Sequence, residues 1–160
     1  MIDIADLELA APSTALAGSL LIQAAINPRY PAHLMIGGGG PRNALLIAEG
    51  RLGFEVVDLS RASGVFLRVA NPRFVVDLAS VVSGFDHSPE AGTLFRTPAG
   101  MGIVATVDHG ECGVLLDGTM VEVDYSQFAG FRHWRIELNG PGEDPHVLFT
   151  YRHSSFTENR

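Results

Sequence analysis

Turn-forming dipeptides divide the C-terminal half of this chain into short runs, and they constrain the fold more than any other feature. His109-Gly110, Asp117-Gly118 and Asn139-Gly140 are typical of tight hairpin turns. The runs around them are rich in β-branched and aromatic residues: Met101–Val107, Gly113–Leu116, Thr119–Tyr125, Phe131–Leu138 and Val147–Arg152. We therefore predict an antiparallel meander of five to six strands over residues 93–152.

Polar and apolar residues alternate along two of these runs, residues 121–125 and 133–138. In the first run, Val123 stands between Glu122 and Asp124. Successive side chains of a strand point to opposite faces, so one face of the sheet is predicted to be buried and the other polar.

The N-terminal half carries two patterns that are typical of helices. Ser13 is suited to cap a helix over Thr14–Ile26, whose apolar residues recur at helical spacing. A second helix is predicted over residues 72–83, with Asn71 as its cap, Pro72 at its first position and Gly84 just beyond its end.

Shorter runs in the same half are predicted to be strands: His33–Ile36, Phe54–Leu59 and Val65–Val69. The apolar run Ala44–Ala48 fits a helix or a strand equally well. Together these patterns predict one α+β domain over residues 1–160, with two helices packed on a strongly curved, mainly antiparallel sheet.

Every positively charged side chain of the chain other than histidine is an arginine, since it has 11 Lys and Arg in total and no lysine. This excludes lysine Schiff-base chemistry and a Walker phosphate loop. The bias is typical of codon usage in a GC-rich genome. The arginines of the N-terminal half occur singly along the sequence, so they predict no cationic cluster.

Net charge is −7, and it is uneven. Residues 1–80 hold 6 Arg and 7 acidic residues, hence −1, whereas residues 81–160 hold 5 Arg and 11 acidic residues, hence −6. An acidic half disfavours binding to nucleic acid or to anionic membranes, which need clustered cations. It favours a basic protein partner.

A single cysteine, Cys112, allows no internal disulfide and gives no reason to expect an oxidising compartment. The first eight residues are acidic where a secretory signal needs positive charge. The apolar run Ala15–Ile26 is too short to span a bilayer. We expect a small, acidic, bacterial-type protein of the cytoplasm.

Four consecutive glycines, Gly37–Gly40, precede Pro41. A glycine loop between a strand and a helix would point backbone N–H groups at an anion, which makes Gly38 and Gly39 candidate ligand contacts. The spacing matches neither a dinucleotide-binding fingerprint nor a nucleophile elbow. A tight surface turn is the alternative interpretation.

The segment Asp108–Cys112 places four reactive side chains within five residues. Cysteine–histidine pairs form nucleophiles, so His109 and Cys112, with Asp108 to orient the base, are the catalytic candidates. The same segment also fits a polar hairpin tip that is followed by a small buried thiol.

Five of the six histidines lie in the acidic half of the chain. On neighbouring strands, His133 and His153 could share a face with Glu122 or Asp124 and hold a metal. The spacing does not support such a site, because a one-residue register slip moves a side chain to the other face. We predict no metal and no cofactor.

The segment Asp58–Gly64, with the sequence DLSRASG, resembles the DxSxxG signature of PilZ domains, small β-barrels that bind cyclic di-GMP. The upstream segment Arg29–His33 resembles a degenerate version of their RxxxR motif. The glycine stands one place late, and His33 replaces the second arginine, whose planar fork it cannot copy. The ligand contacts that this resemblance implies are Arg29, Asp58 and Ser60.

Three classes of function are open from the sequence, and the lack of a complete catalytic motif favours the first. It is a non-enzymatic binding protein whose acidic sheet meets a basic partner. The contacts predicted for it are Asp108, Glu111, Glu122 and Asp124. The second is a small-ligand module, either PilZ-like or with a pocket in a curved sheet. The third is a small enzyme using His, Cys and carboxylate chemistry. The apolar composition also allows a homo-oligomer.

Overall fold

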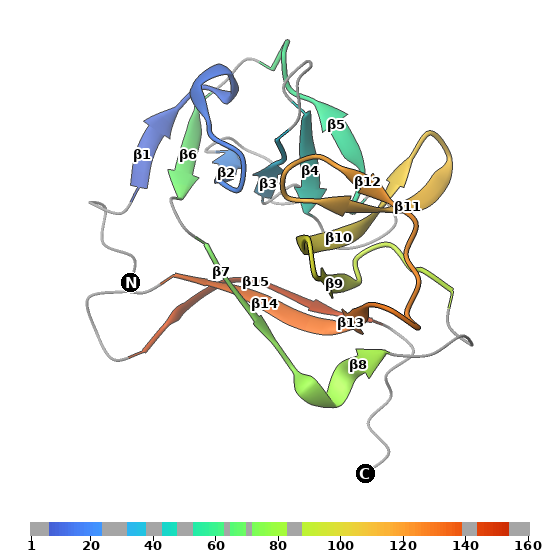
Figure 1. The fold of residues 1–160 in the computed structure, drawn as a ribbon. Helices are drawn as coiled ribbons and strands as arrows, with labels where there is room; N and C mark the ends of the chain where they lie inside the picture. The colour runs from blue at the N-terminus through green and yellow to red at the C-terminus, as the bar shows by residue number, and fades with distance from the viewer. Residues whose placement is uncertain are drawn as a thin grey trace.

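The computed structural model describes residues 7–23, 32–37, 43–47, 53–62, 65–69, 72–82, 88–138 and 144–153. These residues form almost entirely β structure in three antiparallel sheets, as Figure 1 shows. The only helices in the described ranges are two three-residue 3-10 turns, η2 (Pro12–Thr14) and η3 (Leu78–Ser80). The predicted α+β fold with two packed helices is therefore wrong.

The first and second sheets each have six strands. In spatial order, the first sheet contains β1 (Leu7–Ala10), β6 (Phe66–Val69), β2 (Leu20–Gln23), β3 (Ala32–Met35), β4 (Asn43–Ile47) and β5 (Val56–Asp58). The second sheet contains β12 (Met120–Val121), β11 (Gly110–Leu115), β10 (Gly100–Val107), β9 (Leu94–Thr97), β13 (Ala129–Phe131) and β8 (Val81–Val82).

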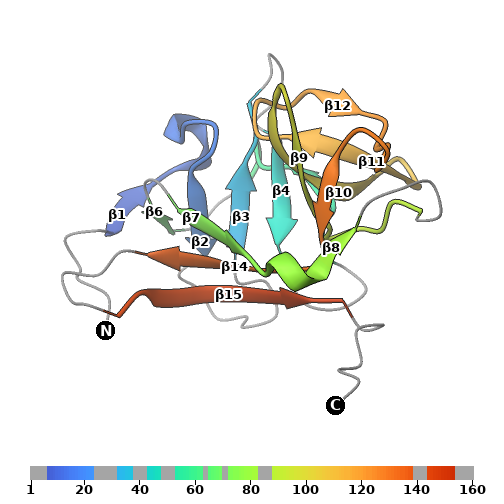
Figure 2. The ribbon, with the colours of Figure 1, turned by 60° about the horizontal axis from the view of Figure 1, so that its bottom comes forward.

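The third sheet has three strands, in the order β15 (His146–Arg152), β14 (His133–Leu138) and β7 (Arg73–Val76). In Figure 2, β14 and β15 lie below the strands of the first sheet and below β9 to β12 of the second, whereas in Figure 1 β8 of the second sheet lies lower than the third sheet. Within residues 93–152, β9 to β12 follow one another as neighbours in the second sheet, so the predicted meander is confirmed for four strands. The hairpin β14–β15 belongs to a different sheet and pairs with β7 from the N-terminal half.

The predicted helix over Thr14–Ile26 is replaced by η2, a turn at Gly18 and strand β2. In β2, Leu20 and Leu21 point to opposite faces and both are fully buried. A strand buried on both faces has no polar alternation, and its continuous apolar run fits a helical face as well. The last residues of the predicted helix, 24–26, lie outside the described residues.

The predicted helix over residues 72–83 is β7, η3 and β8 instead. The β-branched and aromatic residues of β7 pair with β14, where Phe74 lies opposite Ile136 and Val76 opposite Trp134. Tertiary pairing with β14 therefore overrides a helical spacing that the local sequence also allows. The residues predicted to cap this helix, Asn71 and Gly84, lie outside the described residues.

The ambiguous run Ala44–Ala48 is strand β4 over its described part.

One buried hydrophobic cluster joins all three sheets, including Leu45 of β4, Ile103 of β10 and Trp134 of β14. Two further clusters cover the opposite faces of the first and second sheets, around Phe66 and Phe95 respectively. The third sheet thus contributes only one of its faces to these clusters.

The hairpin between β10 and β11 turns one residue earlier than the dipeptide His109-Gly110 predicts. Val107 pairs with Gly110, and the two residues between them, Asp108 and His109, have φ angles of 47° and 72°. Two consecutive positive φ values are the geometry of a type I′ turn.

In the described part of the chain, no helix has the length and apolar character needed to cross a membrane.

Candidate functional site

Polar side chains gather on the solvent-exposed face of the third sheet, which we call the outer face. The cross-strand register arranges this face in three rows. Arg73, Glu137 and Val147 form the first row, Val75, Arg135 and Thr150 the second, and Asp77, His133 and Arg152 the third. Because residues alternate along each strand, the aromatic side chains of the sheet, such as Trp134 and Phe149, lie on its buried face.

Three arginines follow one diagonal of the outer face. Arg73 stands in the first row on β7, Arg135 in the second row on β14, and Arg152 in the third row on β15. All three side chains are exposed. Diagonal neighbours in an antiparallel sheet are about 7–8 Å apart, so the three guanidinium groups form a row of positive charge.

A buried carboxylate holds two of these arginines. Glu137 Oε2 accepts a hydrogen bond from Nη2 of Arg73, and Oε1 accepts one from Nε of Arg135, each at 2.5 Å. The Glu137 side chain is only 1% exposed, whereas those of Arg73 and Arg135 are 53% and 49% exposed. The hydrogen bond from Arg73, followed by that from Arg135, lowers the pKa of Glu137. The carboxylate is therefore ionised at neutral pH and sets the position of both cations.

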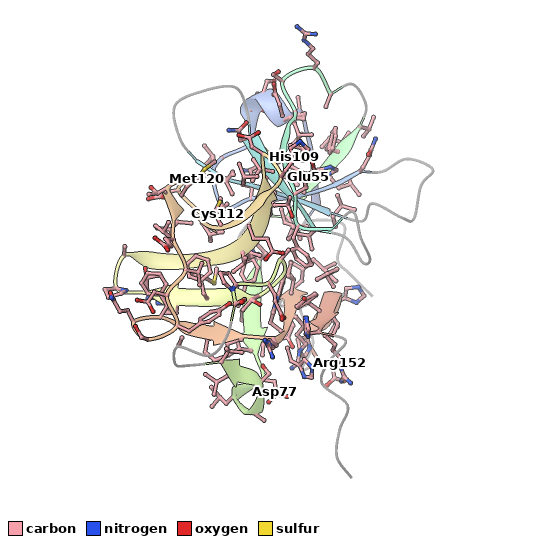
Figure 3. All side chains as sticks on the ribbon, turned by 90° about the vertical axis from the view of Figure 1, so that its right-hand side faces the viewer. Glu55, Asp77, His109, Cys112, Met120 and Arg152 are labelled. Carbon is pink, nitrogen blue, oxygen red and sulfur yellow. The ribbon has the colours of Figure 1, made fainter. Side chains whose placement is uncertain are left out.

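A groove of about 310 Å³ crosses the second and third rows of the outer face. It is lined by Arg135 of β14, by Thr150 and Arg152 of β15, and by Asp77, which follows β7 at the opposite edge of the sheet. Asp77 Oδ1 accepts a hydrogen bond from the Ala79 N–H, and its Oδ2 lies 3.8 Å from Nδ1 of His133. In Figure 3, Asp77 and Arg152 both lie in the lower part of the molecule, away from His109 and Cys112.

This arrangement can bind anions. A guanidinium group offers five N–H donors in a planar fork and stays charged at any physiological pH. Glu137 uses one donor atom of each of two arginines, so other N–H groups of Arg73 and Arg135 are available to a ligand.

The catalytic candidates lie at different points of the β10–β11 hairpin. Asp108 and His109 form the exposed tip of the β10–β11 turn. Cys112 lies on β11 opposite Ala105 and packs against the main hydrophobic cluster. Burial raises the pKa of the Cys112 thiol, which keeps it protonated at neutral pH.

Two of the four acidic residues predicted to contact a partner accept hydrogen bonds from other parts of the chain. Asp124 accepts hydrogen bonds from Ser126 and Gln127, and Glu111 Oε1 accepts one of 3.3 Å from the Ala91 N–H. The hydrogen bonds from Ser126 lower the pKa of Asp124. Glu122 and Asp108 are exposed.

Two of the three contacts that the PilZ resemblance implies, Asp58 and Ser60, lie together in the structure. Asp58 is exposed at the end of β5, and its Oδ1 accepts a hydrogen bond of 2.7 Å from the Ser60 N–H, which makes a local turn. His33 is buried against Phe66, with ring centroids 6.1 Å apart. Burial lowers the pKa of His33. Arg29 lies outside the described residues.

The candidate glycines Gly38 and Gly39 also lie outside the described residues. Gly37 is described, and its N–H donates a hydrogen bond of 2.9 Å to the Leu116 carbonyl. A Cβ atom at Gly37 would stand 3.0 Å from the backbone oxygen of Asp117. At this position glycine permits close packing of two loops.

The two histidines considered for a metal site lie beside different carboxylates. His133 is on the outer face beside Asp77, whereas Nε2 of His153 lies 2.6 Å from Oε2 of Glu90, which also lies 3.4 Å from Nη2 of Arg132. The described residues contain no group of three or more His, Cys, Asp or Glu side chains that could hold a metal ion.

The arginine row has only a partial signal in the sequence. The alternation of His133, Arg135 and Glu137 marks a polar strand face, as the structure bears out. Arg73 gives no such signal, because its local pattern predicts a helix and Glu137 is 64 residues away along the chain. Comparison of the chain with protein-family models, curated proteins and solved structures gives no match.

Proposed function

We propose that the protein is a non-enzymatic binding module that holds an anionic ligand on the outer face of the third sheet. The observation that carries this proposal is the diagonal row of Arg73, Arg135 and Arg152, two of whose members share the buried carboxylate of Glu137. A cytoplasmic location, an absence of nucleic-acid and membrane partners, and assembly with further copies of the chain are predictions that accompany it.

The net charge of −7 favours a cationic ligand, whereas the ligand proposed here is anionic. The charges close to the site support an anionic ligand. Salt screens charges that lie more than about one Debye length away, roughly 8 Å at physiological salt, so the nearby charges decide the sign. The outer face carries three arginines and two carboxylates, those of Asp77 and Glu137, and the Glu137 carboxylate is buried. The acidic residues of the second sheet support a basic partner less well, since Asp124 and Glu111 already accept hydrogen bonds.

Calorimetric titration with phosphate, pyrophosphate and citrate at low salt tests the proposal. We expect Arg135→Ala to weaken binding by about 10- to 100-fold, because a hydrogen bond to a charged group contributes about 1.5–3 kcal/mol. Arg96→Ala is the matched control, since Arg96 is an exposed arginine on β9 of the second sheet. Equal losses in the two variants, or no binding of any of these anions, would contradict the proposal.

A further inference from the structure

We infer that the ligand of the outer face is an extended acidic peptide segment with carboxylates at alternate residues. This inference rests on the proposed function and adds the class of ligand. Its basis is the spacing of the arginine diagonal, the open shape of the groove and the residues that lie between the arginines.

The spacing of the arginines matches an extended peptide. Arg73 with Arg135, and Arg135 with Arg152, are diagonal neighbours, which in an antiparallel sheet lie about 7–8 Å apart. In an extended chain, residues i and i+2 are about 6.6 Å apart and point to the same side. Carboxylates at i, i+2 and i+4 therefore reach all three guanidinium groups. The full row, about 15 Å long, is longer than a single small anion.

The groove has the shape that such a segment needs. It runs over the second and third rows and is open to solvent, so an extended chain can reach Arg135 and Arg152 there. Val75 and Thr150 flank Arg135 within it, and neither carries a charge. The Thr150 hydroxyl can donate a hydrogen bond to a peptide carbonyl beside the central carboxylate.

The same face is poorly suited to single-stranded nucleic acid, which also carries regularly spaced anions. Binding of single strands depends on aromatic side chains that stack on bases. On the third sheet these side chains, Phe74, Trp134 and Phe149, pack against the core.

Two synthetic peptides of the same composition test the inference by fluorescence anisotropy. One has alternate glutamates, Ser-Glu-Ser-Glu-Ser-Glu-Ser, and the other has three consecutive glutamates, Ser-Ser-Glu-Glu-Glu-Ser-Ser. In an extended chain at most two of three consecutive glutamates face the same side, so we expect the alternate peptide to bind about threefold to tenfold more tightly. A heptamer of deoxythymidine is the third ligand, and we expect it to bind more weakly than either peptide.

The variants separate failure of the inference from failure of the proposed function. Equal binding of the two peptides, or tighter binding of the oligonucleotide, would overturn the inference, and the proposed function would stand if Arg135→Ala still weakened citrate binding. If Arg135→Ala left the binding of every ligand unchanged, both would fail. Arg152→Ala is expected to remove the preference for the alternate peptide, because the row is then reduced to two arginines.

Discussion

The indole Nε1 of Trp134 donates a hydrogen bond of 2.8 Å to the carbonyl oxygen of Gly92. The next strand of the third sheet makes a similar contact, since the Tyr151 hydroxyl donates one of 3.1 Å to the Ala91 carbonyl. The buried face of the third sheet thus fixes the segment that leads into β9. Through these two contacts, the sheet that carries the arginine row is joined to the second sheet.

We predict that Gly92→Ala strongly destabilises the fold. Gly92 has a φ of 96°, and a Cβ atom there would stand 2.5 Å from Cζ of Tyr151 and 2.7 Å from Cε2 of Phe54. Overpacking costs about 1–3 kcal/mol, and the left-handed backbone adds about 1–2 kcal/mol for alanine. The melting temperature should fall by roughly 5–15 °C. Gly110→Ala, whose Cβ would meet nothing closer than 3.7 Å, should melt much closer to the original protein.

The β10–β11 turn offers a stabilising change. Asp108 and His109 both have positive φ, which costs most residues about 1–2 kcal/mol and suits the pair Asn-Gly. The double variant Asp108→Asn, His109→Gly should raise the free energy of unfolding by about 1 kcal/mol, measured by urea denaturation. Anion binding should be unchanged. In the neighbouring turn Gly118 already has the positive φ, so Asp117→Asn should not stabilise; a gain there equal to that of the double variant would refute the explanation.

The stability of the fold should decline as the pH falls below about 6.5, partly because of His33. Burial lowers the pKa of His33 from its usual 6.5, so the unfolded chain takes up a proton before the folded chain does. This contribution is complete above pH 6.5 and is lost as the pH falls towards the lowered pKa of the folded state. Thermal melts between pH 5 and pH 8 should show a shallower slope for His33→Leu. The exposed-turn variant His109→Asn should keep the original slope, and an unchanged slope in His33→Leu would count against this assignment.

Glu137 should strengthen anion binding although it is itself an anion. If it acted only as a nearby negative charge, Glu137→Gln would tighten citrate binding. We expect the opposite, a loss of about threefold to tenfold, because the arginines lose the carboxylate that positions them. Asp77→Asn is the control, since this carboxylate contacts no arginine among the described ion pairs, and its removal should leave citrate affinity equal or slightly higher. Tighter citrate binding by Glu137→Gln would remove the positioning role.

The Cys112 thiol should react slowly with iodoacetamide at pH 7.5. Burial raises its pKa and the side chain packs against the core, so little thiolate is present or accessible. Mass spectrometry should show at least about tenfold slower alkylation in buffer than in guanidinium chloride. Fast alkylation of the folded protein would restore Cys112 as a nucleophile candidate.

The antiparallel hairpins could be predicted from the sequence because their causes are local. Turn residues around Gly110 and Gly118 reverse the chain, and the alternation along residues 133–138 chooses which face of β14 is buried. Local patterns do not predict strand β2 of the first sheet. Leu20 and Leu21 are both fully buried there, and a strand covered on both faces has the apolar content of a buried helix.

The sequence by itself determined the antiparallel β character of the C-terminal half, the polar face of residues 133–137 and the lack of lysine chemistry. Only the tertiary structure decided that Arg73 lies opposite Glu137 and on one diagonal with Arg135 and Arg152. Hairpin turns act over a few residues, whereas the pairing of β7 with β14 joins residues that are 58 to 64 positions apart in the sequence. That pairing depends on burying Phe74 and Val76 against the common core, a constraint that no local pattern contains.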